Sequence, residues 1–193
     1  TLVCDTHDAV QNHSRSFDAD AHHALARRAA AESTVLLKNE GDLLPLAAGT
    51  KVAVIGDFAE TPRYQGAGSS AVNSIKVDSL LGCWGESGLE QVGFAAGFDR
   101  QGKPDAAKQA EAVALAQKAD VVLLCMGLDE IKESEGLDRS DMCVAANQIE
   151  LLRALQKVNP NIVVVLSAGA SVETSWAAHC KALVYGALGG QAG

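Results

Sequence analysis

The feature that most constrains this chain is a series of short, almost uninterrupted apolar runs. They read "KVAVIG" (51–56), "VVLLCMG" (121–127), "NIVVVLSAG" (161–169) and "KALVYGAL" (181–188), and "QVGFAAG" (91–97) is a weaker example. Each run is bounded by turn residues and lacks the alternation of polar and apolar residues that a half-exposed strand shows. Such runs are typical of strands buried on both faces. The chain is therefore expected to build a sheet that other elements cover on both sides.

The segments between these runs have the apolar spacing of helices. The first helix is expected to begin at Asp18 or Asp20 and to extend past Leu36, the second opens at Pro104, and the third lies near 146–158. Strands that alternate with helices imply right-handed crossovers and a mostly parallel sheet. The predicted fold class is therefore α/β, with a mostly parallel sheet flanked by helices in three layers.

The length of 193 residues suits one large domain, or one domain with a tail. Residues 1–17 show no periodicity and are interpreted as a linker or arm, and residues 18–193 as the α/β domain. The last residues, "GGQAG", form a glycine-rich turn directly after a strand. Because no helix follows that strand, we expect the domain to be truncated at its C-terminal end.

Charge and composition argue against several classes of partner. The net charge is −8, from 16 basic and 24 acidic residues, and no basic patch is evident, which disfavours nucleic acid. No apolar run reaches the ~18 residues that a membrane span needs. Five cysteines without a CxxC pair favour a reducing, cytoplasmic location and no metal site.

Three loops follow the carboxyl ends of the predicted parallel strands, where ligands of such sheets bind. The loop 57–74 contains "GAGSSA", which has the form of a dinucleotide-binding motif. That motif requires its glycines at the immediate turn from strand to helix, whereas Gly66 lies ten residues after Gly56. We therefore expect no cofactor, and interpret the segment as a long loop that projects Arg63 and Tyr64.

The loop after the strand 121–127 has an unusual density of charge. Eight of the residues 129–141 are charged: Asp129, Glu130, Lys132, Glu133, Glu135, Asp138, Arg139 and Asp141. A solvated surface is the plain interpretation. The alternative is a carboxyl that is partly desolvated at the sheet edge, with the raised pKa that a general acid requires. Spacing alone does not choose among Glu133, Glu135 and Asp138, and Asp138 and Arg139 are adjacent in a way that suits a local ion pair.

The third loop, 170–176, offers less. Glu173 fits the first turn of a helix, where the helix dipole favours an acid. No serine lies in a GxSxG turn, so an esterase has no support. The histidines have no metal-ligand spacing, and His22 and His23 are expected to be exposed on the first helix.

The order of several motifs resembles the α/β-sandwich domain of glycoside hydrolase family 3, the β-glucosidase family. The resemblance is carried by "ARRAAAESTVLLKNEGDLLPL" (26–46), "KVAVIGDFA" (51–59), "YQGAGSSAVN" (64–73), "ESEGLDRSDM" (133–142) and "ALGGQAG" (187–193). Together they cover most of the chain in the order typical of the family. "MCVAANQ" (142–148) departs from the usual Leu-Pro step, so the helix near 146 is expected to begin at a shifted position.

The resemblance implies a retaining β-glycosidase whose aspartate nucleophile lies on a (β/α)8 barrel domain. The general acid/base glutamate then falls on Glu135, positioned or tuned by Lys132, Glu133 and Arg139, and the loop carrying Arg63 and Tyr64 approaches the substrate.

The same resemblance has consequences for the rest of the protein. The barrel is expected upstream, with residues 1–17 as the link, so that the partners are a β-glycoside or oligosaccharide and the barrel itself. The chain alone is expected to be inactive. The alternatives are a non-catalytic carbohydrate-binding or interaction module with the same fold, and a nucleotide-binding domain, which the position of "GAGSSA" disfavours.

Overall fold

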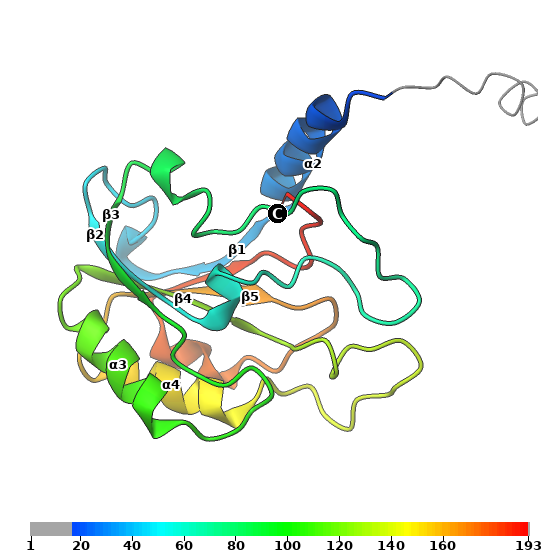
Figure 1. Ribbon diagram of the computed structural model, residues 1–193. Helices are drawn as coiled ribbons and strands as arrows, with labels where there is room; N and C mark the ends of the chain where they lie inside the picture. The colour runs from blue at the N-terminus through cyan, green and yellow to red at the C-terminus, as the bar shows by residue number, and fades with distance from the viewer. Residues whose placement is uncertain (1–16, 193) are drawn as a thin grey trace, which may run out of the picture.

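The computed structural model describes residues 17–192, which form a six-stranded sheet with helices and long loops on its faces (Figure 1). The strand order is β1-β6-β5-β4-β2-β3, and all neighbouring strands are parallel except β1, which is antiparallel to β6. The strands are β1 (Val35–Asn39), β2 (Lys51–Ile55), β3 (Glu90–Ala95), β4 (Val121–Gly127), β5 (Ile162–Ser167) and β6 (Ala182–Tyr185). The predicted mostly parallel α/β sheet is thereby confirmed.

The central strands are buried because their sequences carry almost no polar side chain. Val52 to Ile55 of β2 are fully buried, and β4 and β5 are nearly so. Two glycines at the ends of β2 and β4 allow close contact with the neighbouring strand. An added Cβ at Gly56 would lie 1.9 Å from the carbonyl oxygen of Cys125, and one at Gly127 would lie 1.8 Å from that of Ser167. A side chain at either position would therefore disrupt the edge of the sheet from which the loops leave.

Two helices pack on one face of the sheet, and the third lies on the other side (Figure 1). Helix α3 (Ala106–Ala116) and helix α4 (Ala146–Gln156) contact each other, and the 3-10 helix η4 (Ser175–His179) contacts α4. Helix α4 buries Leu151, Leu152 and Leu155. It begins at Ala146 although its N-cap, Ala145, makes no side-chain cap. Its first turn is fixed instead by the side chain of Gln148. The amide group of this side chain accepts a hydrogen bond from the N–H of Gly127 at 2.9 Å and donates one to the carbonyl oxygen of Gly127 at 3.0 Å.

Helix α2 (Ala19–Ser33) is shorter than the sequence predicts. Asp18 caps its first turn by accepting a hydrogen bond from the amide of Ala21 at 2.9 Å, as predicted. The predicted continuation past Leu36 is wrong, because Thr34 turns to an extended conformation and Val35–Asn39 forms β1. The backbone of this segment gains strand hydrogen bonds to β6, and that long-range pairing overrides the local helical spacing.

Helix α2 contacts the rest of the chain in part through a buried histidine. His23 is 6% exposed, and its Nε2 lies 2.8 Å from Oδ2 of Asp78, in the long connection between β2 and β3. Its Nδ1 lies 3.1 Å from the side-chain amide of Gln191, near the end of the chain. The expectation that His23 is exposed is therefore wrong, since the residue joins three distant segments on that face.

Candidate active site

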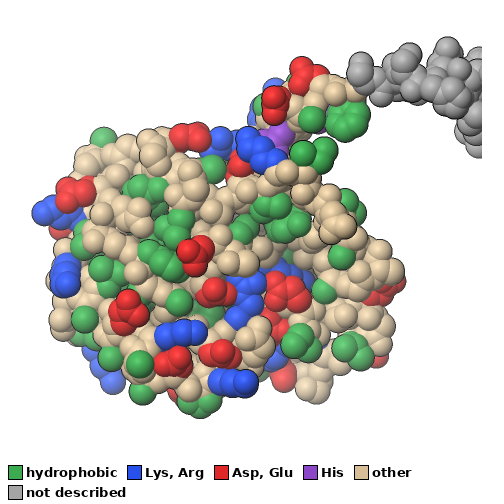
Figure 2. All heavy atoms as spheres, in the orientation of Figure 1, with side chains coloured by type: hydrophobic (Ala, Val, Ile, Leu, Met, Phe, Trp, Pro, Cys, Tyr) green, Lys and Arg blue, Asp and Glu red, His purple; other side chains and the backbone are tan. Residues whose placement is uncertain are grey.

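The loops that follow β2, β4 and β5 meet at the carboxyl edge of the sheet, where the sequence predicts a site. They line a shallow, open hollow of about 380 Å³. Its lining includes Arg63 and Gly66 from the first loop, residues 132–134 and 137–139 from the second, and Gly169 from the third. Figure 2 shows acidic and basic side chains interspersed over one face of the molecule, without a continuous patch of either sign on that face.

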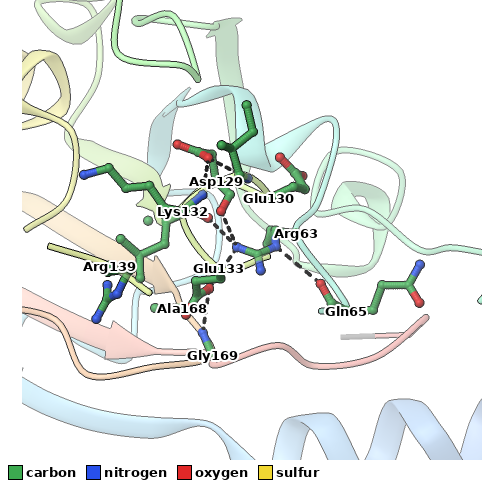
Figure 3. A network of polar contacts seen from close by, with 12 residues as sticks. Arg63, Gln65, Asp129, Glu130, Lys132, Glu133, Arg139, Ala168 and Gly169 are labelled. Carbon is green, nitrogen blue, oxygen red and sulfur yellow. Dashed lines mark hydrogen bonds and ion pairs between the residues drawn. The ribbon is translucent and has the colours of Figure 1, made fainter. Parts of the chain in front are cut away.

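A buried ion pair holds the three loops together (Figure 3). Nη1 of Arg63 lies 2.9 Å from Oε2 of Glu133, and the two side chains are 1% and 8% exposed. The same nitrogen donates to the carbonyl oxygens of Leu128 and Asp129 at 2.8 and 3.0 Å. The amide of Gly169 donates to the same carboxylate oxygen at 3.0 Å. The carboxylate of Glu133 is buried, and it links its own loop to the loops that carry Arg63 and Gly169. Glu133 therefore has a structural role at this end of the sheet.

Most of the other charges in the loop after β4 also have partners within the chain. The buried carboxylate of Asp129 accepts hydrogen bonds from the amides of Ile131 and Lys132 at 2.8 and 2.9 Å, which fixes the first turn of the loop. The ammonium group of Lys132 donates to the carbonyl oxygen of Cys143 at 3.2 Å. Glu130 pairs with Arg100 at 2.8 Å. The density of charge is thus partly explained by the folding of the loop itself.

The predicted local pair between Asp138 and Arg139 is wrong. Arg139 donates instead to the carbonyl oxygen of Ser171 at 2.6 Å, and so ties this loop to the one after β5. Asp138 takes part in no ion pair among the residues that the structure describes. The resemblance predicts that Glu135 is positioned by Lys132, Glu133 and Arg139. No hydrogen bond or ion pair among the described residues joins Glu135 to any of the three, because each of them bonds to other groups.

Glu135 differs from these residues because its carboxylate is exposed and meets only neutral donors. Its Oε2 accepts hydrogen bonds from the hydroxyl of Ser69 and, at 2.9 Å, from the amide of Ser69. The Ser69 hydroxyl, and then the Ser69 amide, lower the pKa of Glu135 because both stabilise the carboxylate. The expectation of a partly desolvated acid with a raised pKa is therefore wrong for Glu135 in this chain.

The backbone beside Glu135 joins the loop after β4 to the glycine-rich loop. Ala67 and Ser134 form a parallel β-bridge, and the amide of Glu135 donates to the carbonyl oxygen of Ala67 at 3.1 Å. Gly136 follows with a φ of +78°, which turns the chain directly after Glu135 as expected of the glycine there. Sequence reasoning missed Ser69, because only the fold brings residue 69 next to residue 135.

Arg63 and Tyr64, predicted to approach a substrate, are placed differently from each other. The contacts of Arg63 are internal, and its side chain is almost completely buried. Tyr64 is half-buried, its hydroxyl accepts a hydrogen bond from the side chain of Gln65 at 3.0 Å, and its carbonyl oxygen accepts one from Gly190 at 2.9 Å. Contact of either residue with a sugar stays a prediction, and for Arg63 the described contacts favour a structural role.

In the third loop, the prediction that Glu173 lies in the first turn of a helix is wrong, because the residue lies two positions before η4, whose first turn contains no acid. The carboxylate of Glu173 accepts a hydrogen bond from the amide of Ser175, the first residue of η4, at 2.6 Å. Elsewhere in the described range, 17–192, no group of three or more His, Cys, Asp or Glu residues is arranged to hold a metal ion. No helix in that range is long and apolar enough to cross a membrane.

Comparison with protein families gives a match over most of the chain. Residues 34–193 match the model described as "Glycosyl hydrolase family 3 C-terminal domain". The chain is 44% identical over 203 residues to the Exo-alpha-(1->6)-L-arabinopyranosidase of Bifidobacterium breve, an alignment that covers 100% of this chain and 27% of that protein. It is 41% identical over 179 residues to the Thermostable beta-glucosidase B of Acetivibrio thermocellus, covering 91% of this chain and 24% of that protein.

Solved structures give the same result. The GH3 beta-glucosidase of Bifidobacterium adolescentis superimposes with a TM-score of 0.93 at 47% identity, over 100% of this chain and 28% of that one. A GH3 exo-beta-xylosidase, XlnD, superimposes with a TM-score of 0.78 at 30% identity over 89% of this chain. The chain thus spans about a quarter of the length of these four proteins, of which it covers 22–28%.

Proposed function

Because the chain belongs to glycosyl hydrolase family 3, as the C-terminal domain of that family, we propose that it supplies the general acid/base to a retaining β-glycosidase. In this proposal the acid/base is Glu135. The aspartate nucleophile and most sugar contacts lie on a (β/α)8 barrel domain outside this chain. The chain alone is expected to be inactive, because retaining hydrolysis needs both carboxyl groups within roughly 5–5.5 Å of each other.

One observation supports Glu135 over Glu133 and Asp138. The Glu135 carboxylate is exposed at the sheet edge and has one fixed oxygen, whereas that of Glu133 is buried and committed to Arg63 and Gly169. A group that must meet a substrate on another domain has to be reachable from outside its own domain. Asp138 is exposed too, but no hydrogen bond among the described residues fixes its carboxylate.

The proposed chemistry has two steps. First, the nucleophile attacks the anomeric carbon while Glu135 gives its proton to the leaving oxygen, so that the glycosidic bond breaks and a glycosyl-enzyme forms. Then Glu135, now a carboxylate, takes a proton from water as the water oxygen attacks the same carbon and releases the nucleophile. One carboxyl group therefore serves as acid and then as base.

This role requires Glu135 to gain a proton when the domains meet. In the chain as described, Ser69 lowers the pKa of Glu135. Docking of a barrel would remove water from the carboxyl and bring the negative nucleophile near it, and both changes raise a carboxyl pKa. We therefore expect the acid function to depend on domain assembly, since only the assembled site provides these two effects.

The names of the relatives support a proposal for the substrate class. They are an arabinopyranosidase, beta-glucosidases and xylosidases, which differ in the sugar but share this domain. α-L-Arabinopyranosides, β-D-glucosides and β-D-xylosides all carry an equatorial anomeric bond in their chair forms, so one placement of the acid suits them all. We therefore assign a terminal, equatorially linked glycoside as the substrate, with the choice of sugar made by the barrel.

The test uses the full-length protein and two aryl β-glycosides, one with a good leaving group and one with a poor one. Glu135→Ala should lower kcat/KM for the poor leaving group by about 10²–10⁴, because only that substrate needs a proton from an acid. The loss for the good leaving group should be much smaller. Asp138→Ala, which removes an exposed carboxylate three residues away, is the matched control and should retain wild-type rates.

Equal losses on both substrates would contradict the role of Glu135. No loss at all on glycosides, together with retained sugar binding, would favour the alternative, a carbohydrate-binding or interaction module with this fold. The lowered pKa of Glu135 is the observation that fits that alternative, since an ionised carboxylate accepts hydrogen bonds from sugar hydroxyls.

A further inference from the structure

We propose that Ser69 is a positioning residue that fixes Oε2 of Glu135 and thereby leaves Oε1 as the oxygen that carries and delivers the proton. This inference rests on the proposed function of Glu135 and concerns how the chain prepares that group. It is built on contacts between two loops that lie far apart in the sequence, after β2 and after β4.

Both donors of Ser69 meet the same carboxylate oxygen. The amide nitrogen lies 2.9 Å from Oε2 of Glu135, and the hydroxyl donates to that oxygen as well. No group among residues 17–192 donates a hydrogen bond to Oε1. A proton added to this carboxyl therefore goes to Oε1, because Oε2 already accepts two hydrogen bonds and each of them opposes its protonation.

The glycine before Ser69 allows this close approach. Gly68 has a φ of +99°, and an added Cβ would lie 2.7 Å from Cβ of Glu135 and 3.2 Å from its Oε2. A residue with a side chain would be strained in that conformation and would push Glu135 away. Gly68 is thus required for Ser69 to reach the carboxylate with its amide.

The loop that carries Ser69 is closed by a side chain. Gln65 accepts a hydrogen bond from the amide of Val72 at 2.9 Å and donates one to the carbonyl oxygen of Val72 at 3.0 Å. The amide of Ala71 donates to the carbonyl oxygen of Gly68 at 3.2 Å within this closed turn. The turn 65–72 therefore has internal hydrogen bonds of its own, in addition to those it makes with the backbone and carboxylate of Glu135, and these support the position of Ser69.

No charge competes with Ser69 for Glu135. None of the ion pairs among the described residues includes Glu135. The pKa of Glu135 is lowered first by the Ser69 hydroxyl and then by the Ser69 amide, and desolvation opposes them with a smaller effect. Removal of the hydroxyl should therefore raise the pKa of Glu135, since it removes the largest effect that favours the carboxylate.

The test compares Ser69→Ala, Ser69→Thr and Ser70→Ala in the full-length protein, with pH profiles of kcat/KM for the poor leaving group. The alkaline limb of that profile reports the acid in the free enzyme. In Ser69→Ala the limb should move to higher pH, and kcat/KM at its maximum should fall about tenfold, the effect of one hydrogen bond to a charged group. The loss should be smaller for the good leaving group.

Two controls separate positioning from a general structural role. Ser69→Thr keeps the hydroxyl and should retain the wild-type limb. Ser70→Ala removes the adjacent exposed hydroxyl, which has no hydrogen bond among the described residues, and should behave as wild type. Matching melting temperatures for all three variants would show that each is folded. A Ser69→Ala profile with an unmoved limb and equal losses on both substrates would overturn the inference.

Failure of the proposed function gives a different result. The Glu135→Ala profile should lose the alkaline limb altogether. If that variant kept the limb, Glu135 would not be the acid, and the proposed function and the inference would both fall. If Glu135→Ala lost the limb while Ser69→Ala left it in place, the inference alone would fail.

Discussion

Glu133 and Glu135 lie two residues apart in one loop, and the fold gives them opposite surroundings. Glu133 is buried, pairs with Arg63 and accepts a hydrogen bond from Gly169. Glu135 is exposed, meets no positive charge among the described residues and is held by the two donors of Ser69. A buried, paired carboxylate stabilises a structure, whereas an exposed and oriented one is available for chemistry. The surroundings in the fold therefore distinguish two residues that their spacing in the sequence leaves equivalent.

The largest difference between the two glutamates is expected when Glu133 is substituted. Glu133→Gln keeps the shape of the side chain but leaves the buried guanidinium of Arg63 without its countercharge, which should cost about 3–5 kcal/mol of unfolding free energy. Urea denaturation of the full-length protein measures this cost. Glu135→Gln is the matched variant and should leave the unfolding free energy nearly unchanged. Equal destabilisation by the two substitutions would contradict the division of roles.

A smaller effect is expected at Gly68, whose backbone allows Ser69 to reach Glu135. Gly68→Ala should destabilise the protein by about 1–3 kcal/mol, because it combines an unfavourable positive φ with a contact of 2.7 Å to Cβ of Glu135. It should also lower turnover of the poor leaving group. The control is Gly136→Ala, where φ is +78° but no atom lies within 4 Å of the added Cβ. If both variants lost the same turnover, the contact with Glu135 would be unimportant.

The smallest effect concerns acid stability. The folded-state pKa of Glu135 is lowered, so its contribution to stability is present above the unfolded pKa of about 4.3 and is lost as pH falls through the folded value. Glu135→Gln should therefore show a slightly smaller loss of stability than wild type between neutral pH and that acid range. Urea midpoints at the two pH values measure the difference. A larger loss in the variant would mean that Ser69 does not favour the carboxylate.

The sequence predicts the parts of this fold whose signals are local. Strands β4 and β5 are uninterrupted apolar runs, and Asp18 caps a helix directly before its first turn. Strand β1 was not predictable in this way, because its backbone partner is β6, which lies about 150 residues further along the chain. Its apolar residues continue a helical spacing, and only pairing at the sheet edge makes them a strand.

The same limit applies to the candidate site. The loop after β4 is recognisable by its density of charge, and the family resemblance points to Glu135 within it. Local sequence does not show that Glu133 is paired with Arg63 or that Ser69 reaches Glu135, because both partners come from the loop after β2. For the same reason His23 was expected at the surface, although Asp78 and Gln191 enclose it.

The most direct test of the division between the two glutamates is rescue by azide, a nucleophile that needs no base. Full-length Glu135→Ala and Glu133→Gln would be compared with a substrate that has a good leaving group. For Glu135→Ala, we predict faster turnover with azide and a β-glycosyl azide as the product, because azide replaces the missing base in the second step. For Glu133→Gln, we predict no acceleration. Azide rescue of Glu133→Gln but not of Glu135→Ala would contradict the account.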